Sequence, residues 1–262
     1  MKHPYVGVLV NQRLFKGIKQ GNTAHEALYQ YVLAGNEYKV TPCFFRLGDI
    51  RPGQPTVRAY VSSGLNYVRK EVPIPHIIHN RAMYHRSTSN KKLERLTRNG
   101  MTIFNQFTRY NKYRIHQILL QDSDIRVSLP ETELATIHSI KGMMSRHDIL
   151  IIKPSNGSIG KGIMKLEKSG DDSWTLFYRG NSQGSYRQYR FRNKLPLFLR
   201  RAITNRTYLV QQRLPLAEYE GRPYDFRVSV QRDRSGDWNV TGIVGKAAAS
   251  RSFITNVAQG GK

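Results

Sequence analysis

A lysine followed by closely spaced glycines, between two apolar stretches, is the part of this sequence best suited to hold a phosphate. The stretch from Ile149 to Leu166 reads ILIIKPSNGSIGKGIMKL, with Lys153 ahead of Gly157, Gly160 and Gly162. Small residues let backbone N–H groups close over an anion, and the lysine adds a positive charge. The same pattern also describes a tight structural turn, so by itself it leaves both interpretations open.

The spacing of these glycines excludes two common phosphate-binding motifs. A Walker A loop needs a glycine where this chain has Ser155, and a serine or threonine where it has Gly162. The dinucleotide-binding fingerprint has its glycine spacings in the reverse order and is followed by a helix, which this sequence does not indicate. The sequence therefore predicts a flexible hairpin loop between two strands, with Lys153 projecting from the first.

The segments after Leu150 predict strands joined by tight turns. Two antiparallel hairpins are expected to turn at about residues 170–173 and 235–237. A helix is expected within residues 192–204, where Pro196 is tolerated in the first turn. The second half of the chain is therefore expected to be α+β.

Two helices are expected before the loop. The first begins behind Asn111 as its cap, and the second runs from about Thr132 to Ser145. The expected inward-facing side chains are Ile115, Ile118 and Leu119 in the first helix, and Leu134, Ile137, Ile140 and Met144 in the second.

Strands and helices alternate over the first part of the chain, which favours an α/β domain. Strands are expected at residues 5–10, 38–47, 56–61 and 75–80, and helices at about 23–35 and 90–100. Thr23 and Glu26 have capping-box spacing, and Gly35 stands where a helix C-terminal cap would lie. The predicted organisation is an N-terminal α/β domain, residues 1–105, and a second domain, residues 106–262.

The charge balance predicts attraction to polyanions. The 262 residues include 42 Lys plus Arg against 18 Asp plus Glu, a formal net charge of +24. The stretch from Arg179 to Arg213 contains basic residues and no acidic residue. Within it the segment YRQYRFRN alternates aromatic residues with arginines, which is typical of an RNA-binding surface. Its aromatic side chains fall on both faces of a strand, which favours a solvated strand over RNA binding.

The remaining composition excludes several classes of protein. The single cysteine, Cys43, excludes an internal disulfide framework and a multi-cysteine metal site, and its apolar setting favours packing over reactivity. His76, His79 and His85 lack the spacing of a zinc site on a helix. No stretch is long and apolar enough to cross a bilayer or serve as a signal peptide, so a cytoplasmic location without membrane association is expected.

Six segments in order carry a resemblance to a known family. They read NKYRIHQILL, LPET, ILIIKPSNGSIGKGI, YLVQQRLPL, YDFRVSVQ and FITNVAQGG, and the resemblance covers roughly Pro75 to Lys262. In this order the chain resembles the ATP-grasp superfamily, and within it the endospore-coat-associated YheC/YheD group. The resemblance implies an ATP-grasp fold behind a pre-ATP-grasp α/β domain.

The resemblance also implies a set of ATP-binding residues. Lys112 and Lys153 match the lysines that contact the phosphates, and residues 155–162 match the flexible loop over the triphosphate. The loop residues concerned are Ser155, Asn156, Gly157, Ser158, Gly160, Lys161 and Gly162. The strand that holds adenine through its backbone matches Gln211, Gln212, Arg213 and Leu214. ATP carries about four negative charges, and each charge-assisted hydrogen bond contributes roughly 1.5 to 3 kcal/mol, so two converging lysines suit it.

Three further residues are implied to be catalytic: Asp225, Arg227 and Asn256, the last in a loop that also contains Gly260 and Gly261. In the family reaction a substrate carboxylate attacks the γ-phosphate, and an amine or thiol captures the acyl phosphate. Arg227 is the candidate for stabilising the transferred phosphoryl group. The alternative is an ion pair with Asp225, which lies two residues away on the same face.

The sequence departs from the family in its metal-binding half. The resemblance implies Mg²⁺, held by an aspartate and an E-x-N pair on strands after the glycine pair, but the sequence ends at Lys262. We therefore expect an ATP-grasp domain that lacks its C-terminal part, with its metal ligands unassigned. Lys246 and Ile254 stand where relatives have arginine, and a lysine does not replace a bidentate fork.

Three functions are compatible with these patterns. The leading one is an ATP-dependent carboxylate–amine ligase of unknown substrate, associated with the bacterial endospore and its coat components. The second is a non-catalytic spore-coat-associated protein with a degenerate ATP-grasp fold. The third, an RNA-binding protein, rests on charge alone. Whether this chain is an active enzyme stays open at the level of sequence.

Overall fold

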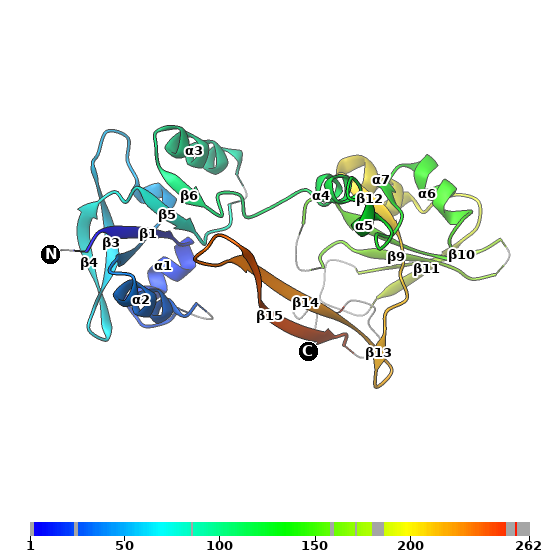
Figure 1. Cartoon of the computed structure of the whole chain (residues 1–262). Helices are drawn as coiled ribbons and strands as arrows, with labels where there is room; N and C mark the ends of the chain where they lie inside the picture. The colour runs from blue at the N-terminus through cyan, green and yellow to red at the C-terminus, as the bar shows by residue number, and fades with distance from the viewer. Residues whose placement is uncertain are drawn as a thin grey trace. The chain divides into compact units, whose positions relative to one another are not determined.

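The computed structural model describes residues 3–23, 26–84, 86–157, 160–170, 172–179, 186–249 and 255. The chain separates into two compact units, Met1–Tyr110 and Asn111–Lys262 (Figure 1). The mixed α/β fold class expected from the sequence is confirmed. In the part of the chain that the structure describes, no helix has both the length and the apolar character that crossing a membrane requires.

The first unit is built on a mixed six-stranded sheet with the order β4-β3-β2-β1-β5-β6. Its four neighbouring strands β2, β1, β5 and β6 are parallel, and β3 and β4 form an antiparallel hairpin at the β2 edge. The strands are β1 (Tyr5–Leu9), β2 (Thr41–Phe45), β3 (Thr56–Ser63), β4 (Asn66–Pro73), β5 (Ile77–Asn80) and β6 (Thr102–Phe104).

Helices cover both faces of this sheet (Figure 1). Side chains alternate along β1, so that Val8 joins one cluster with helices α1 (Gln12–Ile18) and α2 (Leu28–Glu37). Leu9 joins the other cluster with helix α3 (Ser87–Arg98). A short 3₁₀ turn, η1 (Leu47–Asp49), follows β2. The N-terminal unit is therefore doubly wound about β1.

The predicted ends of one helix in this unit are wrong. Helix α2 begins at Leu28 behind Ala27, without the capping box expected at Thr23 and Glu26. Gly35 lies inside the helix and is not its cap. A Cβ at Gly35 would approach Pro42 Cδ and the Val40 carbonyl oxygen to 2.7 Å, so this glycine allows the helix to pass close to β2. Helix α1 and strand β6 were not predicted because they are short, and strand β4 was not predicted because it is mostly exposed and carries three charged residues in a row.

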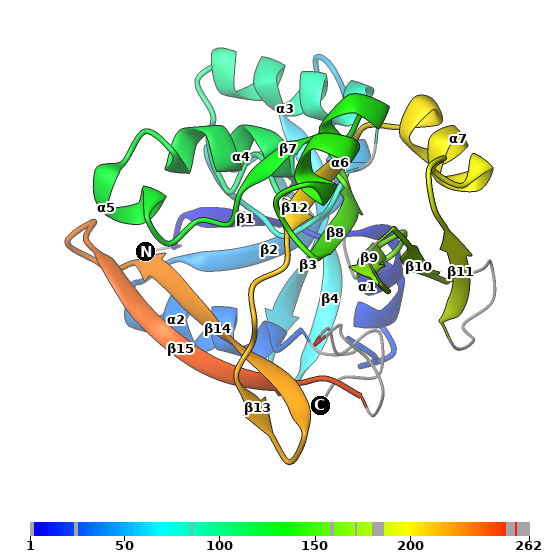
Figure 2. The ribbon, with the colours of Figure 1, turned by 90° about the vertical axis from the view of Figure 1, so that its right-hand side faces the viewer.

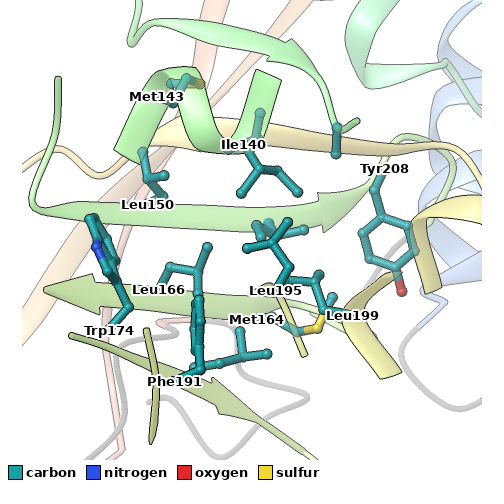
Figure 3. Packing of buried hydrophobic residues seen from close by; sticks show 14 residues of the cluster. Ile140, Met143, Leu150, Met164, Leu166, Trp174, Phe191, Leu195, Leu199 and Tyr208 are labelled. Carbon is teal, nitrogen blue, oxygen red and sulfur yellow. The ribbon is translucent and has the colours of Figure 1, made fainter. Parts of the chain in front are cut away.

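The second unit contains an antiparallel sheet of six strands in the order β11-β10-β9-β8-β12-β7. Figure 3 shows its core, where Ile140 and Met143 of helix α6 face Leu150 and Leu166 of the sheet. The two hairpins and the antiparallel arrangement expected after Leu150 are confirmed. The strands are β7 (Thr132–Leu134), β8 (Ile149–Pro154), β9 (Met164–Lys168), β10 (Trp174–Tyr178), β11 (Arg187–Phe191) and β12 (Tyr208–Gln212). The helices are α4 (Lys112–Leu119), α5 (Ser123–Arg126), α6 (Ile137–Met144) and α7 (Leu197–Asn205).

Two of the predicted helical faces in this unit are wrong. In α4 the buried side chain is His116, whereas Ile118 is 52% exposed. Residues 132–134, which were expected to begin a helix, form edge strand β7, and α6 begins only after Thr136. Thr136 and Ser139 form the capping box that starts α6, so local capping outweighs the helical spacing of Leu134.

A long hairpin follows the six-stranded sheet. Strands β14 (Arg222–Arg232) and β15 (Trp238–Ala247) run side by side, with the short β13 (Glu218–Tyr219) paired to β14 (Figure 2). Alternation places Phe226 and Val228 on one face, where both are exposed, and Asp225 and Arg227 on the other. The alternation therefore separates Asp225 and Arg227 from the exposed apolar side chains of β14.

Candidate functional site

Lys153 projects from β8 on the face of the sheet opposite the hydrophobic core. Burial alternates along β8, with Leu150 and Ile152 in the core and Lys153 on the other face. Gln211 of neighbouring β12 shares that face, and the Lys153 Nζ donates a hydrogen bond of 2.5 Å to Gln211 Oε1. Gln211 Nε2 in turn donates to Thr132 Oγ1 at 2.7 Å, so the amide is held from both ends.

Lys112 reaches the start of the Gly-rich loop from the first turn of α4. Asn111 caps this helix, and its Oδ1 accepts hydrogen bonds from two N–H groups of the first turn. The Lys112 N–H donates to the Ser155 carbonyl at 3.0 Å. The Lys112 Nζ donates to the carbonyl oxygens of Gly157 at 2.6 Å and Pro154 at 3.3 Å. The two predicted phosphate-binding lysines therefore lie at the same end of β8.

The electrostatics of this end of β8 favour an anion. Burial and the positive charge of Lys112 lower the pKa of Lys153 to about 8. Burial and the charge of Lys153 also lower the pKa of His116 in α4. The Lys153 ammonium donates to a neutral amide, which supplies no opposite charge. A positive potential therefore collects where the sequence predicts the triphosphate.

Glycine is required where the loop returns to the sheet. Gly160 and Gly162 have φ values of 71° and 74°, which L side chains rarely adopt. A Cβ at Gly162 would also lie 3.1 Å from Pro154 Cγ and from the Tyr208 hydroxyl. These glycines therefore serve the backbone of the turn, whatever ligand the loop covers.

Arg206, which the sequence analysis counted only as part of the basic stretch, contacts this loop. Its Nη2 donates a hydrogen bond to the Asn156 carbonyl oxygen. Ser155 is fully buried, and its hydroxyl has no partner among the described residues, whereas Lys161 is exposed. Ser158 lies outside the described residues. The available signal for Arg206 was its position two residues before the β12 strand.

The end of β12 offers a backbone donor. The Gln212 N–H donates to the Glu131 carbonyl at 2.9 Å, and the Arg213 N–H donates to the Ile149 carbonyl at 3.1 Å. The next N–H, that of Leu214, finds no acceptor in the described part of the chain. The predicted adenine-binding segment therefore has its first residues tied into the sheet and its last donor available.

Asp225 lies in the separate sheet of the β14–β15 hairpin and is held by two partners. Its Oδ1 forms an ion pair with Lys246, directly opposite on β15, and its Oδ2 accepts a hydrogen bond of 2.5 Å from Thr255. Burial raises the pKa of Asp225, but the bonds from Lys246 and Thr255 and the charge of Arg227 outweigh it and lower the pKa overall. The sequence analysis identified Lys246 only as a departure from the family and missed Thr255.

The roles predicted for the catalytic residues stay predictions. Arg227 is exposed, and the ion pair of Asp225 is made with Lys246, so the Arg227–Asp225 alternative is not found in the described residues. Asn256, Gly260 and Gly261 lie outside the described residues.

The described residues do not fit a magnesium site. They contain no group of three or more His, Cys, Asp or Glu side chains placed to hold a metal ion. The Asp225 carboxylate is already bound to Lys246 and Thr255. Cys43 is buried, and burial raises the pKa of its thiol to about 12, which disfavours a reactive role.

The aromatic residues of the basic stretch are used in packing. Phe191 is buried in the core, and the Tyr189 ring lies edge-on to Phe198 of α7, 6.0 Å between centroids. The Tyr186 ring lies under the Arg179 guanidinium at 4.7 Å. These contacts favour a structural role for the strand over a platform on which RNA bases stack.

Comparison with known proteins identifies the family. Residues 100–262 match the family model described as YheC/D like ATP-grasp. The chain belongs to the YheC/D-like ATP-grasp family. The resemblance inferred from the six segments is therefore confirmed, as is the ATP-grasp fold class. The division into a pre-ATP-grasp domain and an ATP-grasp domain stays a prediction.

Two curated relatives of this family are similar over most of the chain. Endospore coat-associated protein YheD of Bacillus subtilis (strain 168) is 26% identical over 229 residues, which are 84% of this chain and 50% of YheD. Endospore coat-associated protein YheC of the same organism is 25% identical over 245 residues, 90% of this chain and 67% of YheC. The chain thus spans half the length of YheD.

Among solved structures, the chain is similar to the ATP-grasp ligase PsnB. The structure of PsnB complexed with minimal precursor, Mg and ADP has 12% sequence identity and a TM-score of 0.33, and the match covers 86% of this chain and 68% of PsnB. A second PsnB structure, with minimal precursor, has 12% identity and a TM-score of 0.29, over 97% and 93% of the two chains.

Proposed function

We propose that this chain binds ATP, with Lys112, Lys153 and the Gly-rich loop around the triphosphate. The observation that carries the proposal is the pair of lysines at the end of β8, where burial and the charge of Lys112 lower the pKa of Lys153. A buried cation that raises the energy of the free protein is stabilised by an anion that binds beside it. Membership of the YheC/D-like ATP-grasp family supports ATP as that anion.

The base of the nucleotide would lie at the end of β12. The Leu214 N–H has no acceptor there among the described residues, and the bonds of Gln212 and Arg213 to the sheet fix the backbone that presents it. Adenine carries ring nitrogens that accept such a bond. Residues 211–214 therefore recognise adenine through backbone groups, which tolerates a glutamine at position 212.

The reaction that we propose is ATP-dependent ligation of a carboxylate to an amine. The substrate carboxylate attacks the γ-phosphorus, and the bond from this phosphorus to the β-phosphate oxygen breaks. ADP is released and the substrate becomes an acyl phosphate. The amine then displaces inorganic phosphate. In this chain Lys112 and Lys153 would neutralise the phosphates, and Arg227 would stabilise the transferred group, since phosphoryl transfer depends chiefly on positioning and charge neutralisation.

A non-catalytic ATP-binding protein of the spore coat is the second candidate. The absence of a metal-binding cluster in the described residues and the engagement of Asp225 with Lys246 favour it. Association with the endospore is proposed from the names of YheD and YheC alone. ATP binding without ADP formation in an extract of sporulating cells would favour this candidate, and ADP formation would favour the ligase.

The test of ATP binding is thermal unfolding with and without ATP, in the presence and absence of Mg²⁺. We expect ATP to raise the midpoint for the native sequence, by the equivalent of about 2.7 kcal/mol at 100-fold excess over Kd. Lys153→Met should weaken ATP binding about ten- to hundred-fold, because it removes a charge-assisted contact.

Lys168→Met provides the matched control. This half-exposed lysine lies at the end of β9 and pairs weakly with Asp148, 3.8 Å away. The substitution removes one positive charge from the same sheet and should leave the ATP-induced shift of the unfolding midpoint unchanged. An absent ATP shift, or equal responses from the two variants, would contradict the proposal.

A further inference from the structure

The N-terminal unit contains a polar hollow that the proposed ATP site does not use. It has a volume of about 680 Å³, within the range of small-molecule pockets. Its walls come from the segments that follow three parallel strands: Asn11 after β1, Arg46 and Arg51 after β2, and Tyr84 after β5. The first two turns of α3 close it, with Ser89 and Lys92.

The position of this hollow is the one where doubly wound sheets bind ligands. The chain leaves β1 towards α1 on one face of the sheet and leaves β5 towards α3 on the other face (Figure 1). Neighbouring parallel strands whose connections diverge in this way leave a crevice at their carboxyl ends. Residues after both β1 and β5 line the hollow, so it occupies this switch point.

The charges that line the hollow favour an anion. The lining contains three cationic side chains and one carboxylate: Arg46, Arg51 and Lys92, and Asp49. Arg46 forms an ion pair with Asp49 and donates a hydrogen bond to Gln12 Oε1. The Arg51 guanidinium is exposed and makes no hydrogen bond or ion pair with other described residues. Lys92 donates one bond of 2.6 Å to the Ile50 carbonyl, which leaves two ammonium donors.

The N-terminus of α3 adds hydrogen-bonding capacity. Helix α3 has 12 residues, and no side chain caps its N-terminus, where Thr88 and Ser89 carry hydroxyls at the edge of the hollow. The Ser89 N–H donates to the Arg86 carbonyl oxygen at 3.2 Å. Tyr84 also lines the hollow, but its hydroxyl is buried from solvent.

We propose that this hollow binds the phosphate of a small phosphate monoester. The phosphate oxygens accept bonds from the α3 N-terminus, Arg51 and Lys92, as helix N-termini and convergent cations hold phosphates. Val10, Leu47 and Met83 provide an apolar wall for the organic part. Three acceptor oxygens match this set of donors better than the two of a carboxylate. The proposal does not depend on ATP binding.

The test uses the full chain carrying Lys153→Met, so that the proposed ATP site contributes little phosphate binding. Inorganic phosphate and glycerol 3-phosphate are titrated while the backbone amide resonances of Thr88 and Ser89 are followed. Both resonances should shift saturably at constant ionic strength, and the ester should bind more tightly than inorganic phosphate. Arg51→Gln should weaken phosphate about tenfold.

Two further variants serve as controls. Tyr84→Phe should leave phosphate binding unchanged, because the Tyr84 hydroxyl is buried from the solvent that fills the hollow. Arg58→Gln changes the same charge on the exposed side of β3 and should leave binding unchanged. Unmoved Thr88 and Ser89 resonances, equal effects of the two arginine changes, or acetate binding as tightly as phosphate would overturn the proposal.

Discussion

Lys153 illustrates at the residue scale how a binding group is prepared at the expense of stability. The ammonium is mostly buried and close to the charge of Lys112, and both effects lower its pKa to about 8. Its hydrogen bond to Gln211 orients the side chain but supplies no opposite charge. The buried charge of Lys153 therefore destabilises the free protein. An anionic ligand that binds beside it removes this penalty.

This burial predicts a specific dependence of stability on pH. An unfolded lysine has a pKa of about 10.4, whereas that of folded Lys153 is about 8. Between these values the unfolded chain binds more protons, so the contribution of Lys153 to the free energy of unfolding rises with pH. Below pH 8 the full penalty applies. Lys153→Met should therefore stabilise the ATP-free protein at pH 7, and its advantage should shrink as the pH approaches 10.

Chemical denaturation of both proteins at a series of pH values measures this difference. Lys168→Met, on the neighbouring strand, serves as the control for removing a charge without burial. A difference between Lys153→Met and the native sequence that stays constant from pH 7 to 10 would show that Lys153 keeps its proton in the folded state.

At the scale of elements, the cap of α4 positions Lys112. Asn111 accepts two backbone hydrogen bonds, and the next residue is the lysine whose Nζ holds the loop. Asn111→Ala should cost about 1 kcal/mol of stability, the usual contribution of such a cap. It should also weaken ATP binding, because the first turn that carries Lys112 frays. Thermal unfolding and an ATP titration measure the two effects.

Asp122→Ala is the control for this variant. Asp122 caps α5 through the N–H groups of Asp124 and Ile125, and α5 carries no predicted ATP contact. The Asp122→Ala variant should be less stable than the native sequence but should bind ATP with unchanged affinity. Parallel losses of ATP affinity in both variants would indicate a general effect of instability.

Substitution by alanine at two helical glycines should have opposite effects on the stability of the protein. Alanine is favoured over glycine in a helix by about 1 kcal/mol. At Gly142 in α6 the added Cβ meets only Arg146 Nη1, at 3.6 Å, so Gly142→Ala should stabilise by about that amount. At Gly35 in α2 the Cβ would lie 2.7 Å from Pro42 Cδ and from backbone, and overpacking of about 1–3 kcal/mol outweighs the gain. Melting temperatures compare the two, and stabilisation by Gly35→Ala would refute the close approach.

At the scale of the whole molecule, each unit has a hydrophobic core of its own. The N-terminal sheet is packed on both faces, with Leu9 in one cluster and Val8 in the other. The second unit is built around Ile140 and Leu166. Units with separate cores generally unfold as separate cooperative steps.

Calorimetry should therefore resolve two transitions. ATP should raise the transition of the second unit, which contains Lys112 and Lys153, and leave the other unchanged. The Gly35→Ala and Gly142→Ala variants assign the transitions, since each lies in one unit. A single transition that ATP shifts as a whole would contradict independent unfolding.

The sequence by itself determined the family, the elements of strong periodicity and the residues that gather at the end of β8. Lys153 could be placed because a continuous apolar run defines its strand, and Asn111 because a cap acts within one turn. These are local signals. They also misled at Gly35, where a local cap pattern concealed a long-range packing requirement.

Only the tertiary structure decided which distant residues meet. The pairing of β8 with β12 brings Gln211 to Lys153, and the hairpin register sets Lys246 against Asp225. The hollow of the N-terminal unit is likewise formed by segments that follow three separate strands. Strand order and register depend on packing between segments far apart in the chain, which residue spacing within one segment does not encode.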